Sequence, residues 1–405
     1  MDPINRRKFL QTGFLASGAV LLAGKSWGKN EAAQPSLYQA PMVSWPEKKP
    51  LIMHSNTPPL LETPREVFAT AITPNDRFFV RWHHAVIPQS IDLKTWALRI
   101  EGNVDSPVSL TLQDLKTRFE PVEFVAVKQC AGNSRSNFKP ITGGIQWGHG
   151  AMGCALWKGA RLKDVLQYAR IKANSQFIAV NGLERPTLPT TPPFVRKLDI
   201  DESMRDDVII AYAMNGSDIP LLNGYPVVLV VPGYFADNWV KMLERIVVLD
   251  KDEPVFYTDK AYRMPDTNPF GAVEPGGEMP QKTRPVKALK IKSVIAKPSP
   301  NAEFRRGAHI EMTGVAFDSG MDIRDVLVSV DGGLTWTSSH LDRDLGRYAF
   351  RKWNYRFISK KRGPCTLMCR AINRLGETQP LARDMGWNPS GYQWNAADSV
   401  TIQII

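Results

Sequence analysis

Cysteine is scarce in this chain of 405 residues, which contains only Cys130, Cys154, Cys365 and Cys369. No Cys-x-x-Cys-His run occurs, so we expect no covalently attached haem, and no zinc-finger spacing occurs either. Cys365 and Cys369 fall in "CTLMCRAIN", which alternates as a strand does. Residues four apart on a strand are separated by about 13 Å, too far for a disulfide. An even number of cysteines still allows disulfides in an oxidising compartment, but not between these two.

Other catalytic signatures are also missing. The six histidines include one adjacent pair, His83 and His84, whose side chains would face opposite ways on a strand. No His-Glu-x-x-His or Ser-His-Asp arrangement stands out. The run "GHGAMG" at 148–153 matches the dinucleotide fingerprint, but no apolar strand precedes it. We therefore expect no nicotinamide or flavin cofactor, and a loop that lets a bulky ligand approach explains these glycines equally well.

Clusters of basic residues interleaved with aromatic ones are absent, which argues against nucleic-acid binding. The formal net charge of +11 is spread along the chain and suits an anionic small substrate or an acidic protein partner. With 43% hydrophobic and 22% charged residues, the composition is that of an ordinary globular protein. The length predicts two or three domains.

The N-terminus has the pattern of an export signal. Arg6, Arg7 and Lys8 precede a short apolar stretch that contains Gly and Ser. We interpret residues 1–30 as a twin-arginine signal peptide, with a membrane anchor or a mobile basic tail as the alternatives. That route exports folded proteins, so it suits a chain that acquires a bulky cofactor in the cytoplasm. We expect a periplasmic protein whose mature chain is not stably inserted in a membrane.

The remainder divides by composition into three segments. Residues 31–65 are rich in proline and predict an irregular, extended arm. Residues 66–283 mix helical and strand patterns without strict alternation, so a doubly wound parallel sheet is not expected; Thr111 is placed to cap a helix. Residues 284–405 contain short, evenly spaced strands, with a tight hairpin at Asp331-Gly332-Gly333, and predict an immunoglobulin-like β-sandwich. The fold class is therefore α+β.

Two stretches carry candidate chemistry. In "DRFFVRWHH", Arg81 and His83 would share one face of a strand. In "VEFVAVKQCAGNSR", the apolar run ends on Cys130, and Arg135 follows five residues later. A thiolate persists beside positive charge or a metal, and arginine binds planar oxyanions. The plainer interpretations are a surface ion pair for Arg81 and a small buried hydrophobe for Cys130.

The order of motifs resembles the sulfite oxidase family of molybdenum enzymes from about residue 60 to the C-terminus. The motifs that carry this resemblance are "FFVRWH", "KQCAGNSR", "WGHGAMGCALWKGARL", "VIIAYAMNG", "NGYPVVLVVPG", "WVKML", "KAYRMPDT", "VSVDGGLTW" and "GWNPSGY". The resemblance implies a mixed α/β domain that binds molybdenum with molybdopterin, followed by a dimerisation domain of immunoglobulin-like fold.

The resemblance also implies roles for individual residues. Cys130 matches the thiolate ligand of molybdenum, Tyr262 matches the active-site tyrosine, and Arg81 and Arg135 match arginines near the substrate anion. Trp147 corresponds to a substrate-side indole donor. Taken alone, Tyr262, Phe79 and Trp239 would be interpreted as packing residues. The implied cofactor-binding positions are Phe79, Val80, Arg81, Trp82, His83, Glu184, Asn223, Trp239, Val240 and Lys241.

The chain departs from the vertebrate pattern at three positions. Asn223 stands where vertebrate members have a histidine, and Val228 stands where they have an arginine. Ser390, in "WNPSG", replaces a third arginine at the substrate. The anion pocket is therefore expected to be less positive, and part of the phosphate anchoring must come from elsewhere.

The resemblance implies oxidation of sulfite to sulfate by a homodimer that contains no haem of its own and passes electrons to a separate periplasmic cytochrome c. Three alternatives stay open. They are the molybdenum subunit of a sulfur-oxidation complex acting on carrier-bound sulfane sulfur, a reductase of methionine sulfoxide, and a binding module without a cofactor. Reductases of that type generally lack the C-terminal sandwich that "VSVDGGLTW" predicts.

Overall fold

An antiparallel sheet opens the described part of the chain. The computed structural model describes residues 42–268 and 271–405, so the predicted signal peptide lies outside it. Strands β1 (Met42–Trp45), β2 (Lys48–Ser55) and β3 (Leu60–Glu62) pair in sequence order, and β4 (Val80–Arg81) adds to β3. The expectation of irregular structure was wrong for residues 42–62, because prolines such as Pro46 and Pro58 fall in the turns between strands.

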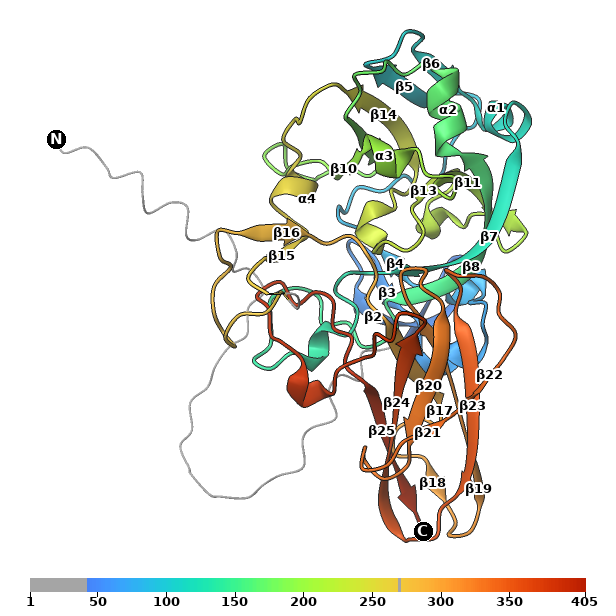
Figure 1. The fold of residues 1–405 in the computed structure, drawn as a ribbon. Coiled ribbons are helices and arrows are strands. Elements are labelled where there is room, and N and C mark those ends of the chain that lie inside the picture. The colour runs from blue at the N-terminus through green and yellow to red at the C-terminus, as the bar shows by residue number, and fades with distance from the viewer. Residues whose placement is uncertain (1–41, 269–270) are drawn as a thin grey trace, which may run out of the picture. The chain divides into compact units, whose positions relative to one another are not determined.

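Two five-stranded sheets lie in the upper half of the molecule as drawn in Figure 1. Within them, β14 pairs with β5 in parallel and every other pair is antiparallel. The first sheet has the order β10 (Val195–Asp199), β9 (Phe177–Gly182), β14 (Leu243–Leu249), β5 (Leu98–Gly102) and β6 (Val108–Leu110). The second has the order β12 (Ser217–Asp218), β11 (Ile209–Met214), β8 (Met152–Arg161) and β7 (Pro121–Gln129), with β13 (Val228–Val230) also paired to β11.

The helices are short and lie beside these sheets. Helix α1 (Leu112–Thr117) begins with the predicted cap, since Thr111 and Asp114 exchange hydrogen bonds as a capping box. Helices α1 and α2 (Leu162–Tyr168) pack next to β8, and α3 (Ile200–Ser203) and α4 (Phe256–Asp259) pack next to β10. Short 3-10 helices are found at Arg65–Ala69, Asn75–Arg77, Arg135–Asn137, Leu221–Asn223, Ala236–Asn238 and Ala382–Asp384. This mixture confirms the α+β class.

The C-terminal part, after the pair β15 (Arg263–Pro265) and β16 (Thr283–Pro285), is a β-sandwich that we call the C-terminal sandwich. Its core includes Ile295, Met312, Trp353 and Leu367. One sheet has the order β17 (Lys292–Lys297), β19 (His309–Phe317), β23 (Arg351–Ile358) and β22 (His340–Leu341). The other has the order β18 (Glu303–Phe304), β25 (Asp398–Ile404), β24 (Gly363–Asn373), β20 (Ile323–Ser329) and β21 (Thr337–Ser338).

The predicted hairpin of the sandwich joins β20 to β21. Gly332 and Gly333 both have positive φ there, at 73° and 92°, which L side chains rarely adopt. Asp331 accepts hydrogen bonds from the backbone N–H groups of Leu334 and Thr335. The connection runs from 330 to 336, so it is longer than the tight turn that the sequence predicts.

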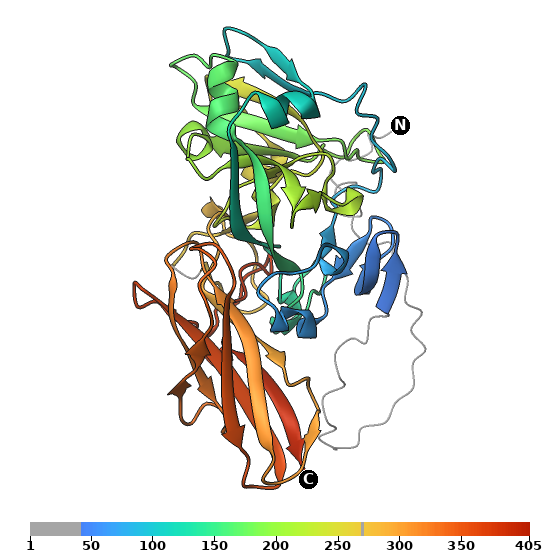
Figure 2. The ribbon, with the colours of Figure 1, turned by 90° about the vertical axis from the view of Figure 1, so that its right-hand side faces the viewer.

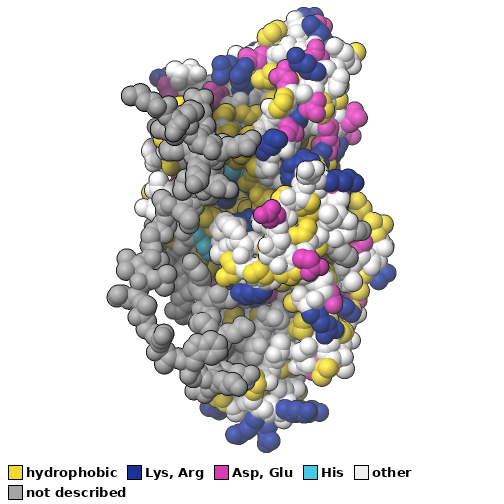
Figure 3. Space-filling view, turned by 90° about the vertical axis from the view of Figure 1, so that its left-hand side faces the viewer, with side chains coloured by type: hydrophobic (Ala, Val, Ile, Leu, Met, Phe, Trp, Pro, Cys, Tyr) yellow, Lys and Arg dark blue, Asp and Glu magenta, His cyan; other side chains and the backbone are white. Residues whose placement is uncertain are grey.

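Figure 2 shows the sheet formed by β1 to β4, in blue, beside the region where the green and orange parts of the chain meet. On the face shown in Figure 3, basic and acidic side chains are interspersed over the described residues that are visible there. Within residues 42–268 and 271–405, no helix is both long enough and apolar enough to span a membrane.

Candidate active site

Cys130 follows β7 directly, at the point where that strand stops pairing with β8. The last register pair joins Gln129 to Met152, and Cys130 N then donates to Ala151 O at 2.9 Å. Cys130 is 8% exposed and lines a cavity. The apolar run thus ends where the strand ends, and Cys130 lies at the wall of the cavity.

The segment around β4 supplies one wall of the same cavity. Phe79, Arg81 and His83 line it, as expected for alternate residues of an extended chain. Val80 and Trp82 face the other way, into a small core that includes Leu51 and Met242. Two of the five predicted cofactor contacts in this stretch therefore belong to the packing behind the cavity wall.

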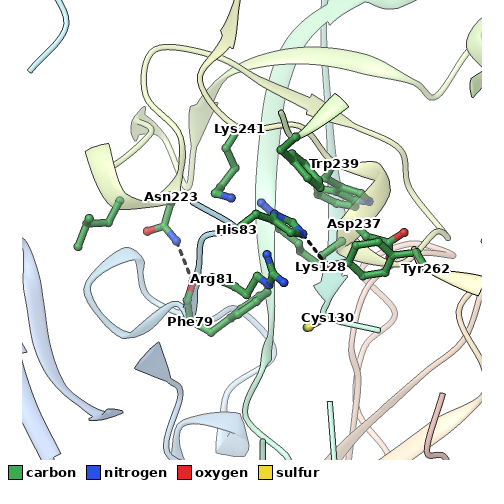
Figure 4. A pocket seen from close by; sticks show the side chains of 13 residues that line it. Phe79, Arg81, His83, Lys128, Cys130, Asn223, Asp237, Trp239, Lys241 and Tyr262 are labelled. Atoms are coloured by element: carbon green, nitrogen blue, oxygen red, sulfur yellow. Dashed lines mark hydrogen bonds between the residues drawn. The ribbon is translucent and has the colours of Figure 1, made fainter. Parts of the chain in front are cut away.

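The cavity encloses about 460 Å³ of space between atoms, part of which is open to solvent. Figure 4 shows the side chains of Arg81, Cys130 and Tyr262 gathered at one side, with Asn223 and Lys241 at the other. Its lining combines a thiol, cations and aromatic rings: Phe79, Arg81, His83, Lys128, Cys130, Phe194, Leu222, Asn223, Ala236, Asp237, Trp239, Lys241 and Tyr262.

Tyr262, His83 and Glu184 form a line of polar groups at one end of the cavity. The Tyr262 hydroxyl lies 2.5 Å from His83 Nε2, and the backbone N–H groups of His83 and His84 donate to Glu184 Oε2 at 2.9 and 3.0 Å. Burial lowers the pKa of His83 well below its ordinary value and raises that of Tyr262 well above it. Both groups are therefore neutral at pH 7.

The direction of the hydrogen bond between Tyr262 and His83 follows from Glu184. Burial alone would raise the pKa of Glu184, but His83, Lys241 and the His84 N–H hold it below its usual range, so the carboxylate is ionised. A proton on His83 Nδ1, 3.8 Å from Glu184 Oε1, faces that negative charge. His83 Nε2 is then the acceptor, and the Tyr262 hydroxyl donates to it.

Three basic side chains, Arg81, Lys128 and Lys241, line the cavity, and only Asp237 among the lining residues carries a carboxyl group. Burial and the nearby Lys241 lower the pKa of Lys128 well below its ordinary value, and burial lowers the pKa of Lys241 to about 8. Burial opposes the charge of Arg81 as well, but Tyr262 and Cys130 raise its pKa. Arg81 Nη1 is buried and has no hydrogen-bond partner among the described residues. With Arg81 charged and two lysines that can gain a proton when an anion binds, the cavity suits an anionic ligand.

Asn223, at the far side of the cavity, is held by a residue from β2. Lys48 Nζ donates to Asn223 Oδ1, to Asn75 O at 2.6 Å and to Phe78 O at 3.3 Å, and Asn223 Nδ2 donates to Phe79 O at 3.0 Å. Lys48 thus places a cation behind the position where the sequence lacks the histidine of vertebrate members. The nearby Val228 is fully buried in β13, where it pairs with Ala211.

Replacing Lys48 by Met is expected to change how stability depends on pH. Burial lowers the pKa of Lys48 to about 7 in the folded protein, whereas an unfolded chain keeps its lysines protonated up to about pH 10.5. Between these values the unfolded state binds more protons, so the contribution of Lys48 to the free energy of unfolding rises with pH, by at most about 1.4 kcal/mol per pH unit. Lys48→Met should lose this contribution when denaturant unfolding is followed at pH 7, 8 and 9. Lys49→Met, at an exposed neighbouring position, should keep the wild-type slope, and equal slopes in all three proteins would contradict the assignment.

The sequence prediction missed a buried ion pair beside Tyr262. Arg196 Nη2 lies 3.1 Å from Asp237 Oδ2, and both side chains are 1% exposed. Burial raises the pKa of Asp237 to about 7 despite this partner. The Arg196 guanidinium also lies 5.4 Å from the centroid of the Tyr262 ring. Asp237 lies two residues before Trp239, which was a predicted cofactor-binding residue. No spacing in the sequence connects Asp237 to Arg196.

Other predicted residues lie around the cavity in different ways. The Trp239 ring lines it, with Lys128 Nζ 5.7 Å from the ring centroid, whereas Val240 is buried without lining it. Glu184 lies behind His83, as described above. Trp147 is 1% exposed and packs against His54, with ring centroids 4.7 Å apart, so the structure does not bring its indole to the cavity.

Arg135 is buried next to the cavity rather than in its lining. Its Nε donates to Gly391 O and its Nη1 to Ile145 O, both at 3.2 Å. Its guanidinium lies 5.2 Å from the centroid of Tyr392, whose ring stacks on Tyr262. A Cβ atom at Gly132, Gly144 or Gly391 would come within 3.0 Å of this guanidinium, so the three glycines make room for it. Ser390 donates to Arg263 O at 3.0 Å.

Comparisons with known proteins agree with this geometry. Residues 84–257 match the family model "Oxidoreductase molybdopterin binding domain", and residues 283–405 match "Mo-co oxidoreductase dimerisation domain". The sulfite oxidase of Gallus gallus is 30% identical over 369 residues, which cover 87% of this chain and 78% of that protein. The chain belongs to the sulfite oxidase family. The resemblance inferred from the motifs is thereby confirmed.

Further relatives support the assignment to the sulfite oxidase family. The mitochondrial sulfite oxidase of Rattus norvegicus is 30% identical over 386 residues, which cover 90% of this chain and 68% of that protein. Among solved structures, the sulfane dehydrogenase SoxCD from Paracoccus pantotrophus aligns with a TM-score of 0.73 and 23% identity, covering 94% of this chain and 96% of that one. That likeness shows a shared fold.

The side chains of the cavity fit the molybdenum–molybdopterin group of this family. Cys130 offers a soft thiolate at the wall, as a metal already held by sulfur prefers. Arg81 Nη1, buried without a partner, and the cations Lys128 and Lys241 can bind anionic oxygens. Phe79 and Trp239 offer flat apolar surfaces for a ring system.

Proposed function

We propose that this protein is a periplasmic sulfite dehydrogenase, which oxidises sulfite to sulfate and passes the electrons to a separate cytochrome c. The observation that carries the proposal is the presence of the Cys130 thiol and the partnerless Arg81 donor in one cavity. When bound, the molybdenum–pyranopterin group supplies oxygen-atom transfer and takes up the electron pair of the sulfur. The chain itself contributes anion binding, orientation and proton handling.

Arg81 binds the substrate anion in this proposal. Its guanidinium is fixed by burial before the substrate arrives, so no reorganisation is needed when charge shifts during the reaction. Arg135 contacts the active site only indirectly, because Tyr392 lies between its guanidinium and Tyr262.

Tyr262, His83 and Glu184 provide an exit for protons. Oxidation of sulfite takes its oxygen from water and releases the protons of that water. The Tyr262 hydroxyl donates to His83 Nε2, and the Nδ1 proton of His83 faces the ionised Glu184. A proton that reaches the Tyr262 oxygen can therefore pass to His83 Nε2, and the ionised Glu184, 3.8 Å from Nδ1, stabilises the positive charge that the ring then carries.

Tyr262→Phe should lower kcat for sulfite by about a hundredfold, because it removes the first member of this relay. Stopped-flow and steady-state kinetics over pH 6 to 9 measure the effect. Tyr257→Phe is the matched control, since its ring packs against both His83 and Tyr262 in the same aromatic cluster. Equal losses in the two variants would show that the Tyr262 hydroxyl has no special part in the reaction.

The test of the proposed function combines molybdenum analysis with an assay of sulfite-dependent cytochrome c reduction. Protein matured in a host that makes the cofactor should contain about one molybdenum per chain and reduce cytochrome c only when sulfite is present. Oxygen alone should reoxidise the enzyme slowly, and rapid turnover with oxygen would contradict a dehydrogenase. Protein without molybdenum would favour a binding module instead.

The proposed export route has its own test, because the twin-arginine motif lies outside the described residues. Arg6→Lys together with Arg7→Lys should retain the protein in the cytoplasm, as judged by fractionation and immunoblotting. Periplasmic protein after this change would contradict the proposed route.

We also propose that the protein is a homodimer. The match of residues 283–405 to a dimerisation domain supports this, and sedimentation at micromolar concentration should give about twice the mass of one mature chain. A single species with the mass of one chain would contradict the dimer.

A second candidate substrate is sulfane sulfur bound to a carrier protein. Ser390 stands where a third arginine would meet free sulfite, and its hydroxyl is engaged by Arg263 O. SoxCD, which shares the fold, is described as a sulfane dehydrogenase. Turnover with free sulfite and no added partner separates the two candidates.

A further inference from the structure

Ser134 connects the loop that follows Cys130 to the C-terminal sandwich. It lies directly before Arg135 and has a φ of 67°, an uncommon value for a residue with a side chain. Lys292, the first residue of β17, donates from Nζ to Ser134 Oγ at 2.7 Å and to Trp394 O at 3.1 Å. Lys292 is 1% exposed, so this contact is buried where the sandwich meets the loop.

The contact continues through His149 to a carboxylate of the sandwich. Ser134 Oγ lies 3.0 Å from His149 Nδ1, and His149 Nε2 lies 3.3 Å from Asp398 Oδ1. Asp398, the first residue of β25, also accepts from Ile295 N at 2.8 Å and pairs with Arg65 at 3.2 Å. All of these groups belong to one buried polar cluster.

The hydrogen bonds of this cluster have a single consistent direction. Asp398 is ionised, and a proton on His149 Nε2 faces that charge at 3.3 Å, which leaves Nδ1 to accept from the Ser134 hydroxyl. Ser134 Oγ is thereby left free to accept from Lys292. Burial lowers the pKa of His149 to about 4, in agreement with a neutral ring. Every member has a partner of the right kind, which buried polar networks need in order to be rigid.

A second set of contacts holds the same loop against residues 391–394 of the C-terminal segment. Gln393 N donates to Ala131 O at 2.9 Å, and Arg135 Nε donates to Gly391 O. Phe138 meets Trp394 edge to face, with ring centroids 4.9 Å apart. The loop from 131 to 138 is therefore bounded by the C-terminal segment along its length.

We propose that Lys292 and Asp398 are positioning residues for the reaction, acting through Ser134 and His149 on the loop that carries Cys130 and Arg135. The C-terminal sandwich then has a part in setting the geometry of the catalytic loop as well as in dimerisation. The kinetic readout rests on the proposed function, whereas the structural readout does not.

Lys292→Met, Ser134→Ala and the double variant test this proposal in the molybdenum-loaded enzyme. Losing this buried hydrogen bond should raise KM for sulfite about tenfold and change kcat less than about twofold. The double variant should be no worse than either single one, because both remove the same contact. Lys297→Met, at the exposed end of β17, is the matched control and should behave as the wild type.

Hydrogen exchange of the loaded enzyme, followed by mass spectrometry, provides the readout that is independent of activity. Amides of residues 131–138 should exchange about tenfold faster in Lys292→Met and in Ser134→Ala, while the core strands β8 and β11 keep their protection. A uniform loss of protection, additive KM effects or an unchanged loop would each overturn the proposal. If Lys292→Met does not fold, Ser134→Ala carries the test alone. A wild type that does not oxidise sulfite refutes the proposed function but leaves the exchange measurement decisive for this inference.

Discussion

Cys130→Ser should lose more than about a hundredfold in sulfite turnover, since changing even an outer partner of a metal ligand costs ten- to a hundredfold. A serine hydroxyl has nearly the same size but does not ionise at neutral pH, so it replaces a soft anionic ligand by a neutral hard one. The fold should tolerate the change, because Cys130 is held by its backbone N–H and its side chain faces the cavity. Steady-state kinetics and the absorption spectrum of the purified variant measure the loss.

Cys365→Ser is the control for Cys130→Ser. It makes the same chemical change at a partly exposed position of β24, whose thiol donates only to Val330 O at 3.2 Å. Its turnover should match that of the wild type. Equal activity in Cys130→Ser and the wild type would refute the thiolate role and favour a protein that binds without catalysis.

Arg81→Met should lower kcat/KM for sulfite by about a hundredfold to a thousandfold, as removal of a preorganised donor to a reacting oxyanion does in other enzymes. The methionine fills much of the arginine volume, so the loss reports the charge and the hydrogen bonds rather than a void. Arg81→Lys keeps a charge but loses the planar guanidinium group. Its kcat/KM should therefore lie between those of the wild type and Arg81→Met.

The measurement for Arg81 needs a separate estimate of cofactor content, because the same guanidinium can hold the anionic cofactor. Rates are therefore expressed per molybdenum atom. Arg99→Met is the control, because Arg99 makes a half-exposed ion pair with Glu244. A surface ion pair of this kind is the plainer interpretation of Arg81 from its sequence. A loss of less than about threefold in Arg81→Met would show that Arg81 contributes no more to the reaction than an ordinary ion pair does.

Local patterns in the sequence were enough to predict the parts of the site that lie within one strand. The apolar run before Cys130 predicted the end of β7, and the alternation along an extended chain predicted that Arg81 and His83 share one face, whereas Phe79 was implied only by the family resemblance. The capping pattern at Thr111 was also local. In each case a side chain and the backbone that orients it lie within a few residues of each other.

Contacts between distant segments were beyond the reach of such patterns. Lys48 and Asn223 are 175 residues apart, and Arg135 and Gly391 are 256 residues apart. Nothing near Arg135 in the sequence shows that its guanidinium turns toward Tyr392 rather than into the cavity. The pair of Arg196 with Asp237 likewise depends on where two separate strands and loops meet. The sheet at 42–62 was missed because prolines dominate its composition.

The alternation of Phe79 to His83 between the cavity and the small core behind it sets a rule for changes in chain length. Deleting or inserting a single residue just before this segment would turn Val80 and Trp82 toward the cofactor space and bury Arg81 among Leu51 and Met242. A change of one residue would therefore disable catalysis and packing together. A change of two residues would keep the same side chains facing the cavity and the small core. We therefore expect the insertion or deletion of one residue here to be more damaging than that of two.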